Sequence, residues 1–242
     1  MELRGTTAVV SGAGSGLGKA LATALVAKGA TVHGLGRTEQ KLQDLHTELG
    51  ETFIPVVLDI AHEQAVRIWV ERTFRGATRL DILINNAGAG HFGKVDKLPA
   101  EQWREMIDTN LNGMFYLTSS MVPFMKKNPR STHIINIGSI LGKVGSPERS
   151  GYCATKFGVQ GFSGSLAMEL RNVGIKVTCV NPGSINTHFF EGSGIEPHDN
   201  MLHPKDIAHL IMQLLETPDN MLVDEITLRP LQPRDPKPNT RA

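Results

Sequence analysis

The sequence predicts a single doubly wound α/β domain, in which a mostly parallel sheet of seven strands carries helices on both faces. Seven short runs rich in Val and Ile alternate with longer segments of helical periodicity. The apolar runs are continuous, which is typical of parallel strands buried on both faces. A glycine-rich stretch follows the first run directly, at the point where folds of this class bind phosphate groups.

The predicted strands and helices follow one another in strict alternation. The strands are expected at 7–10, 31–35, 52–58, 81–85, 133–137, 175–180 and 225–229. The helical segments are expected at 17–28, 39–49, 63–74, 99–126, 152–171 and 204–216. Right-handed crossovers join such strands, and ligands bind outside their carboxyl ends. The functional residues should therefore gather at that edge of the sheet.

Chain length and composition favour one domain. A chain of 242 residues with 40% hydrophobic residues can bury a single sizeable core. No internal repeat or linker divides it, so we assign residues 1–229 to the domain. The tail 230–242 contains four prolines and no apolar periodicity, and we expect it not to join the core.

The charge balance and the cysteines exclude several classes of function. Lys and Arg number 25 against 24 Asp and Glu, so the chain has no field that would attract nucleic acid or an anionic membrane. No apolar run is long enough to cross a bilayer, and the N-terminus lacks signal-peptide organisation. Cys153 and Cys179 have no metal-binding or redox spacing, and "HEQAV" (62–66) lacks the second histidine of a zinc motif. We expect a cytoplasmic protein without metal, nucleic-acid or membrane partners.

The stretch "SGAGSGLGKA" (11–20) fits neither of two common phosphate-binding patterns. The P-loop pattern fails because Ala13 stands at its first glycine, and the G-x-G-x-x-G pattern fails because Leu17 stands at its third. The looser spacing Gly12-x-x-x-Gly16-x-Gly18 keeps the same physical logic. The chain turns sharply out of a strand, and a helix N-terminus then directs its N–H groups at an anion.

Seven motifs occur in an order that resembles the short-chain dehydrogenase/reductase family, in its compact single-domain branch with a Rossmann fold. They are "SGAGSGLG" (11–18), "LDI" (58–60), "NNAG" (85–88), Asn110 in "DTNLNG", Ser139 in "INIGSI", "YCATK" (152–156) and "NPGSINT" (181–187). The first has Ser11 where the family has Thr. The resemblance covers residues 6 to about 190. It implies hydride transfer between a nicotinamide cofactor and a carbonyl or alcohol carbon.

The resemblance implies four catalytic residues: Asn110, Ser139, Tyr152 and Lys156. Tyr152 and Lys156 are four residues apart on one predicted helix and so share a face. An ammonium beside a phenol is expected to lower the phenol's pKa toward working pH, which would let Tyr152 give or take a proton. The Ser139 hydroxyl, after a strand end, would bond the substrate oxygen. In the family, the residue at the position of Asn110 holds a water in a proton relay.

The predicted cofactor-binding residues come from the same motifs. They are Gly12, Ser15, Gly16, Leu17, Gly18, Arg37, Asp59, Ile60, Asn86, Ala87, Gly88, Tyr152, Lys156, Pro182, Gly183, Ile185 and Thr187. Arg37 lies just after the second predicted strand, where NAD enzymes carry an acid, and a guanidinium there suits a 2′-phosphate. We therefore predict NADP(H), with NAD as the alternative if Glu39 reaches the ribose. Asp59 is also a candidate to cap the following helix instead.

The substrate is less well defined by the sequence. We expect His91, Leu141, Val144, His188 and Phe189 to wall the substrate pocket. The leading interpretation is a reductase of small carbonyl compounds, and the alternative is a 3-oxoacyl-[acyl-carrier-protein] reductase. The ending "DEITLRPLQPR" replaces the glycine-rich tail usual in the acyl-carrier enzymes and is more similar to that of sepiapterin-reductase-like enzymes and small hydroxy-acid dehydrogenases.

Two expectations concern the whole protein. The long helical segments 99–126 and 152–171 match those by which the family dimerises, so we expect a homodimer or homotetramer. A non-catalytic dinucleotide sensor is a remote alternative. Such a protein would be free to lose the four catalytic residues, and this chain keeps all of them.

Overall fold

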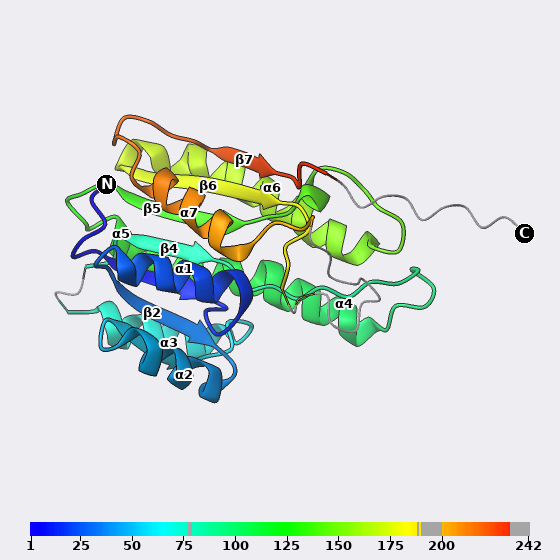
Figure 1. Ribbon diagram of the computed structural model, residues 1–242, viewed down its shortest axis with the longest axis horizontal. Helices are drawn as coiled ribbons and strands as arrows, with labels where there is room; N and C mark the ends of the chain where they lie inside the picture. Colours follow the sequence, from blue (N-terminus) through cyan, green and yellow to red (C-terminus); the bar gives the residue numbers. More distant parts are fainter. Residues whose placement is uncertain (77–78, 188, 190–199, 233–242) are drawn as a thin grey trace, which may run out of the picture.

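The computed structural model describes residues 1–76, 79–187, 189 and 200–232, and its seven strands form one sheet (Figure 1). The strands are β1 (Thr7–Ser11), β2 (Thr31–Gly36), β3 (Phe53–Val57), β4 (Ile82–Asn85), β5 (Thr132–Ile137), β6 (Ile175–Pro182) and β7 (Glu225–Leu228). Their order is β3-β2-β1-β4-β5-β6-β7, and all neighbouring strands pair in parallel. The predicted doubly wound α/β fold is confirmed.

Helices cover both faces of the sheet. They are α1 (Gly16–Ala27), α2 (Glu39–Leu49), α3 (Glu63–Phe74), α4 (Ala100–Ile107), α5 (Met114–Met125), α6 (Ser150–Leu170) and α7 (Pro204–Leu215). One core cluster packs α1, α2 and α7 against one face, with Leu21 and Ile211 fully buried. A second cluster packs α3, α5 and α6 against the other face, with Val66 and Met121 fully buried. Among the described residues, no helix is long and apolar enough to cross a membrane.

The helix predicted over 99–126 is interrupted. A π-helical turn, Asp108–Gly113, separates α4 from α5. At Gly113 a Cβ atom would come within 2.7 Å of Ile60 Cγ1. The π-helical turn can therefore lie this close to the loop that follows β3 only because residue 113 is glycine. Such turns insert an extra residue into a helix and are frequent at functional sites. Periodicity alone cannot reveal this turn because the apolar positions continue through it.

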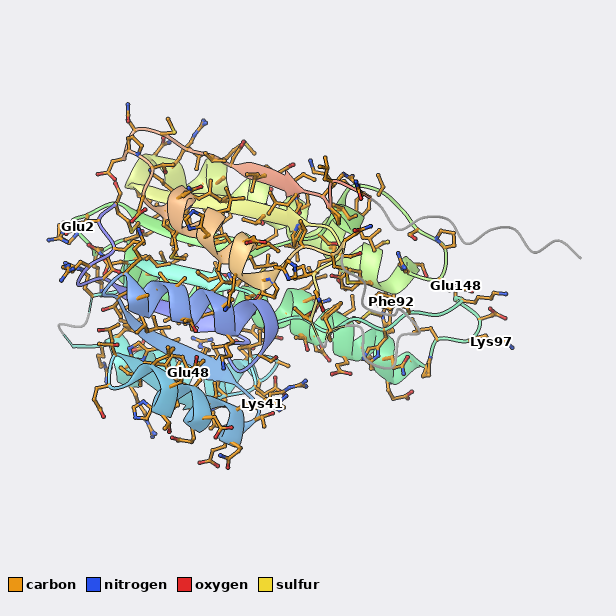
Figure 2. The ribbon with its side chains drawn as sticks, viewed as in Figure 1. Glu2, Lys41, Glu48, Phe92, Lys97 and Glu148 are labelled. Carbon is orange, nitrogen blue, oxygen red and sulfur yellow. The ribbon has the colours of Figure 1, made fainter. Side chains whose placement is uncertain are left out.

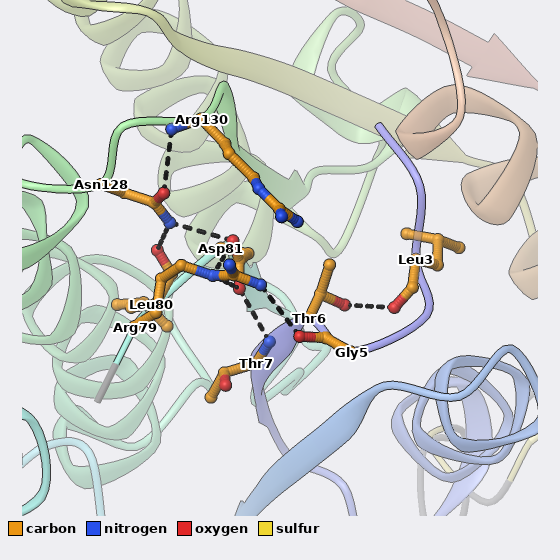
Figure 3. A network of polar contacts seen from close by, with 9 residues as sticks. All are labelled: Leu3, Gly5, Thr6, Thr7, Arg79, Leu80, Asp81, Asn128 and Arg130. Atoms are coloured by element: carbon orange, nitrogen blue, oxygen red, sulfur yellow. Dashed lines mark hydrogen bonds and ion pairs between the residues drawn. The ribbon is translucent and has the colours of Figure 1, made fainter. Parts of the chain in front are cut away.

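A buried carboxylate ties the amino ends of the central strands together (Figure 3). Asp81 precedes β4, and its Oδ2 accepts hydrogen bonds from the Thr7 backbone N–H at 2.9 Å and from Arg79 Nε at 3.0 Å. Asn128 Nδ2 donates to Asp81 Oδ1 at 2.9 Å, and Arg79 Nη2 donates to the Gly5 carbonyl at 2.9 Å. The network stabilises the end of the sheet opposite to the predicted site.

The strand order reverses its direction of growth between β1 and β4, which makes the carboxyl ends of these strands the topological switch point. After β6 the chain passes through 183–187 and returns at 200–202, where Ile185 and Leu202 form a parallel bridge. The predicted domain boundary at 229 stays a prediction, because 233–242 lie outside the described residues.

Candidate active site

A cleft of about 550 Å³ opens at the carboxyl ends of the strands. Its size is that of a typical small-molecule site. Every residue that the sequence predicts to bind the cofactor lies in its wall: Gly12, Ser15, Gly16, Leu17, Gly18, Arg37, Asp59, Ile60, Asn86, Ala87, Gly88, Tyr152, Lys156, Pro182, Gly183, Ile185 and Thr187. Six separate segments of the chain therefore converge on one space.

The glycine loop fits a ligand that needs close backbone approach. Gly12 has a φ of +68°, and a Cβ atom there would lie 2.9 Å from Ala87 Cα. A Cβ at Gly18 would collide with the Gly12 carbonyl. Helix α1 begins at Gly16, and the side chain of Ser15 does not cap it. The first N–H groups of α1 have no partner within the helix and suit an anion in the cleft.

Ser11 and Asn86 fix this loop against the loop after β4. Ser11 Oγ accepts hydrogen bonds from the backbone N–H groups of Asn86 and Ala87, both at 3.0 Å. Asn86 Nδ2 in turn donates a hydrogen bond to the Ser11 carbonyl at 2.9 Å. The hydroxyl of Ser11 thus makes the two loops one rigid rim of the cleft.

Ser139 is held at the end of β5 by two hydrogen bonds. Its backbone N–H donates to Asn181 Oδ1 at 3.2 Å, and its Oγ accepts from the Leu141 N–H at 3.1 Å. Because Oγ accepts this bond, its hydroxyl hydrogen can be donated on the cleft side, where Tyr152 is its hydrogen-bond partner. Asn181 is a positioning residue that the sequence analysis did not single out, although it opens the "NPGSINT" motif.

Tyr152 and Lys156 lie one turn apart on α6, and both line the cleft. Lys156 Nζ is 5.7 Å from the centre of the Tyr152 ring and donates a hydrogen bond to the Ile137 carbonyl at 2.9 Å. Tyr152 and Lys156 share a face of the helix, as predicted. Both lie in the cleft wall together with Ser139.

The pKa values of this pair are dominated by burial. Burial raises the pKa of Tyr152 above its usual value, and a hydrogen bond with Ser139 opposes the rise. Burial also lowers the pKa of Lys156 to about 8. The expectation that Lys156 lowers the pKa of Tyr152 is not met in this structure, because burial of the phenol raises that pKa and the influences that oppose the rise come from Ser139 and Arg149.

Asn110 lies beside the cleft wall and braces it. It sits in the π-helical turn, where its Oδ1 accepts from the Ala89 N–H at 2.7 Å and its Nδ2 donates to the Ala89 carbonyl at 2.9 Å. Nδ2 also donates to Thr155 Oγ1 at 3.0 Å. Asn110 thereby joins the loop after β4 to helix α6.

The end of the cleft beside the connection from β2 to α2 carries two cations. Arg37 is exposed and forms a long ion pair with Glu105 at 3.5 Å. Lys41, on the first turns of α2, lines the same wall but was not predicted, because sequence spacing does not show which helical residue faces the loop. Asp59 lines the cleft, and its Oδ1 accepts from the Ala61 N–H at 3.0 Å ahead of α3. The N-cap of α3 is His62, so Asp59 does not cap that helix as the alternative expected.

Only part of the predicted substrate wall is formed as expected. Leu141 and Phe189 line the cleft, while His188 lies outside the described residues. Two of the predicted residues do not line the described cleft. His91 turns away to bond Glu105 at 2.8 Å on α4, and Val144 is half exposed to solvent on the loop after β5.

Two further residues line the wall at this end. Phe92 and Arg149 both line the cleft, with the Arg149 guanidinium carbon 5.5 Å from the centre of the Phe92 ring. Arg149 lies three residues before Tyr152, and that proximity was the available sequence signal. Within the part of the chain that the structure describes, no three His, Cys, Asp or Glu side chains gather as a metal site.

Comparison with known proteins identifies the family. The sequence model of the short chain dehydrogenase family matches residues 6–196. The chain belongs to the short-chain dehydrogenase family. An uncharacterized oxidoreductase of Staphylococcus aureus strain MW2 is 37% identical over 229 residues, which cover 93% of this chain and 96% of the relative. An uncharacterized oxidoreductase of Staphylococcus epidermidis is 31% identical over 230 residues, or 95% of this chain and 99% of the relative.

Solved structures of other short-chain dehydrogenases have the same architecture. A serine dehydrogenase complexed with NADP+ has a TM-score of 0.84 at 29% identity, covering 92% of this chain and 94% of that one. A 3-ketoacyl-(acyl-carrier-protein) reductase from Brucella melitensis, complexed with NADH, has a TM-score of 0.83 at 27% identity, covering 94% and 97%. A metagenomic short-chain oxidoreductase in complex with NADP has a TM-score of 0.82 at 32% identity, covering 96% and 100%. The protein is thus an oxidoreductase of this family.

Proposed function

We propose that the protein transfers hydride between NADP(H) and a small carbonyl or alcohol substrate, with Tyr152 as general acid in the direction of reduction. The observation that carries the proposal is the convergence of Ser139, Tyr152 and Lys156 on the cleft that begins at the glycine loop. A nicotinamide dinucleotide supplies or accepts the hydride when bound. The chain's own residues supply the proton and orient the substrate oxygen.

In this proposal Tyr152, Ser139 and Lys156 each have a distinct role. Tyr152 keeps its proton at neutral pH, because burial raises its pKa, and so can donate it to a carbonyl oxygen. The Ser139 hydroxyl, the hydrogen-bond partner of Tyr152, can donate to the same oxygen as negative charge develops on it. Lys156 holds one N–H on the Ile137 carbonyl and keeps two for ribose hydroxyls or for proton transfer to Tyr152.

The proposed cofactor is NADP(H) in preference to NAD(H). Arg37 and Lys41 place two positive charges at the wall where the β2–α2 loop passes, and both suit a 2′-phosphate. The serine dehydrogenase and the metagenomic oxidoreductase hold NADP, which supports the choice, whereas the Brucella reductase holds NADH. Glu39, the residue considered for NAD, is not part of the described cleft wall.

The proposed substrate is a small carbonyl compound, and a 3-oxoacyl thioester on an acyl carrier is the second candidate. The second candidate is favoured by the likeness to the Brucella reductase. The first is favoured by the aromatic wall of Phe92, Tyr152 and Phe189, which narrows the substrate end of the cleft.

A homodimer or homotetramer is proposed for the assembly. Phe115 on α5 and Phe157 and Met168 on α6 are large apolar side chains left 52%, 47% and 63% exposed. These are the helices predicted from the family resemblance to pair between subunits. Sedimentation velocity should give a species of at least two chains.

The function is tested by following NADPH oxidation with purified protein. An α-dicarbonyl such as butane-2,3-dione and an acetoacetyl thioester are offered in parallel, each with NADH as control. Preference for the dicarbonyl with NADPH supports the leading candidate, and turnover of the thioester alone supports the second. Absence of turnover with every carbonyl compound would refute the proposed function.

A further inference from the structure

The substrate end of the cleft places a single arginine among aromatic rings. Phe92, Arg149, Tyr152 and Phe189 all lie in the wall. The ring centre of Tyr152 is 5.6 Å from that of Phe92 and 5.9 Å from that of Phe189. Rings on both sides reduce the access of water to the Tyr152 hydroxyl, so a charge beside them acts more strongly than it would in solvent.

Few of the Arg149 donors have a partner among the described residues. Its side chain makes no capping bond to α6, and within that part of the chain its guanidinium donates one long hydrogen bond, from Nη1 to Ser146 Oγ at 3.5 Å. No Asp or Glu among the described residues forms an ion pair with it. A guanidinium packed on a ring keeps its in-plane N–H groups available, and their fork matches a carboxylate.

The backbone before Arg149 is strained in a way that fixes its position. Glu148 has a φ of +61°, a left-handed conformation that costs stability in a residue other than glycine. Its carbonyl accepts a hydrogen bond from the Gly93 N–H at 2.7 Å, which joins the loop before α6 to the loop that carries Phe92. Figure 2 shows Glu148 and Phe92 on these neighbouring loops, beyond the carboxyl ends of the strands. The contact holds Arg149 against Phe92.

The charge of Arg149 also reaches the reacting group. Burial raises the pKa of Tyr152, and the positive charge of Arg149 is among the influences that oppose the rise. Arg37 and Lys41 come from the β2–α2 region of the wall, so a 2′-phosphate there does not need Arg149.

We propose that Arg149 binds the carboxylate of the substrate, and that the substrate is a small oxo acid or the corresponding hydroxy acid. The inference rests on the proposed function and names the substrate class for the same site. In reduction, the carbonyl carbon takes a hydride from NADPH and its oxygen takes a proton from Tyr152, which gives the hydroxy acid and NADP+. The carboxylate stays ionised on Arg149 and fixes the position of the carbonyl carbon.

The test compares acids with their neutral esters. The probes are pyruvate against methyl pyruvate and acetoacetate against methyl acetoacetate, followed by NADPH oxidation. The wild type should prefer at least one acid over its ester by about tenfold or more in kcat/KM. Arg149→Gln should lower kcat/KM for that acid by about tenfold or more, mainly through KM, and change that for the ester by less than about threefold.

Two further variants separate recognition from folding and from overall charge. Arg149→Lys keeps the charge without the fork and should retain part of the preference for the acid. Lys97→Gln removes a positive charge from an exposed side chain at the same end of the molecule, outside the cleft wall, and should leave both substrates unaffected (Figure 2). Each variant should bind NADPH as the wild type does.

Several results would overturn the inference. An ester that reacts as well as its acid, or an Arg149→Gln variant that loses both equally, excludes a carboxylate-binding role. If neither acid reacts but butane-2,3-dione does, and Tyr152→Phe abolishes that reaction, the inference fails while the proposed function stands. If no carbonyl compound reacts with NADPH, both fail.

Discussion

The chemistry of the site depends on two buried side chains, Tyr152 and Lys156. Burial shifts the pKa of each in the direction that favours its uncharged form. Tyr152 is expected to stay protonated across the neutral range, whereas Lys156 loses its charge near pH 8. The pair is therefore prepared to donate a proton at neutral pH, which suits carbonyl reduction more than alcohol oxidation.

This difference predicts the pH dependence of turnover. As pH rises through about 8, the fraction of Lys156 that carries a proton falls, so Tyr152 is less readily reprotonated after each turnover. The kcat for carbonyl reduction should decrease above pH about 8, measured at saturating NADPH and substrate. A rate that stays constant to pH 10 would show that Lys156 does not supply the proton.

Cofactor selection can be tested at Arg37. Its replacement in Arg37→Ser removes charge-assisted hydrogen bonds to a 2′-phosphate, each worth about 1.5–3 kcal/mol. The Kd of NADPH should rise roughly tenfold to a hundredfold, and that of NADH should change less than about threefold, as measured by fluorescence titration. Arg67→Gln, on the exposed surface of α3, is the matched control. Equal weakening of both cofactors would contradict the assignment.

Among the secondary-structure elements, the sequence predicts the regular helices and strands but not the local departures from them. Helices α2 and α3 have the predicted bounds, because their apolar periodicity is clear, and each strand begins and ends within two residues of its predicted range. The π-helical turn and the left-handed Glu148 depend on contacts with Ile60 and Gly93, which are distant in sequence. The sequence analysis missed Lys41 and Arg149 as residues of the cleft wall for the same reason.

The network around Asp81 predicts an effect on stability that is separate from activity. Asp81→Asn replaces a buried acceptor of several hydrogen bonds, including those from Thr7 and Arg79, with a group that satisfies fewer of them. The free energy of unfolding should fall by about 2 kcal/mol or more in urea titrations. The KM values should not change, because the network lies at the amino ends of the strands. Loss of NADPH affinity in the folded variant would contradict this separation.

For the whole molecule, the motifs predict the cofactor end of the cleft better than the substrate end. The glycine loop and the segments after β4 and β6 act through their backbone, and their positions follow from strand order. The substrate end is built from loops whose side chains turn according to tertiary contacts. His91 illustrates this, since its bond to Glu105 takes it out of the predicted wall.

The central claim is that Tyr152 transfers the proton in a reaction that this cleft supports. The most direct test is Tyr152→Phe, assayed for NADPH oxidation with the best carbonyl substrate and for NADPH binding by fluorescence. The account predicts a loss of kcat of at least about a thousandfold with a Kd for NADPH within about threefold of the wild type, because the ring packing is kept and only the hydroxyl is removed. Undiminished turnover in the folded variant would contradict the role assigned to Tyr152.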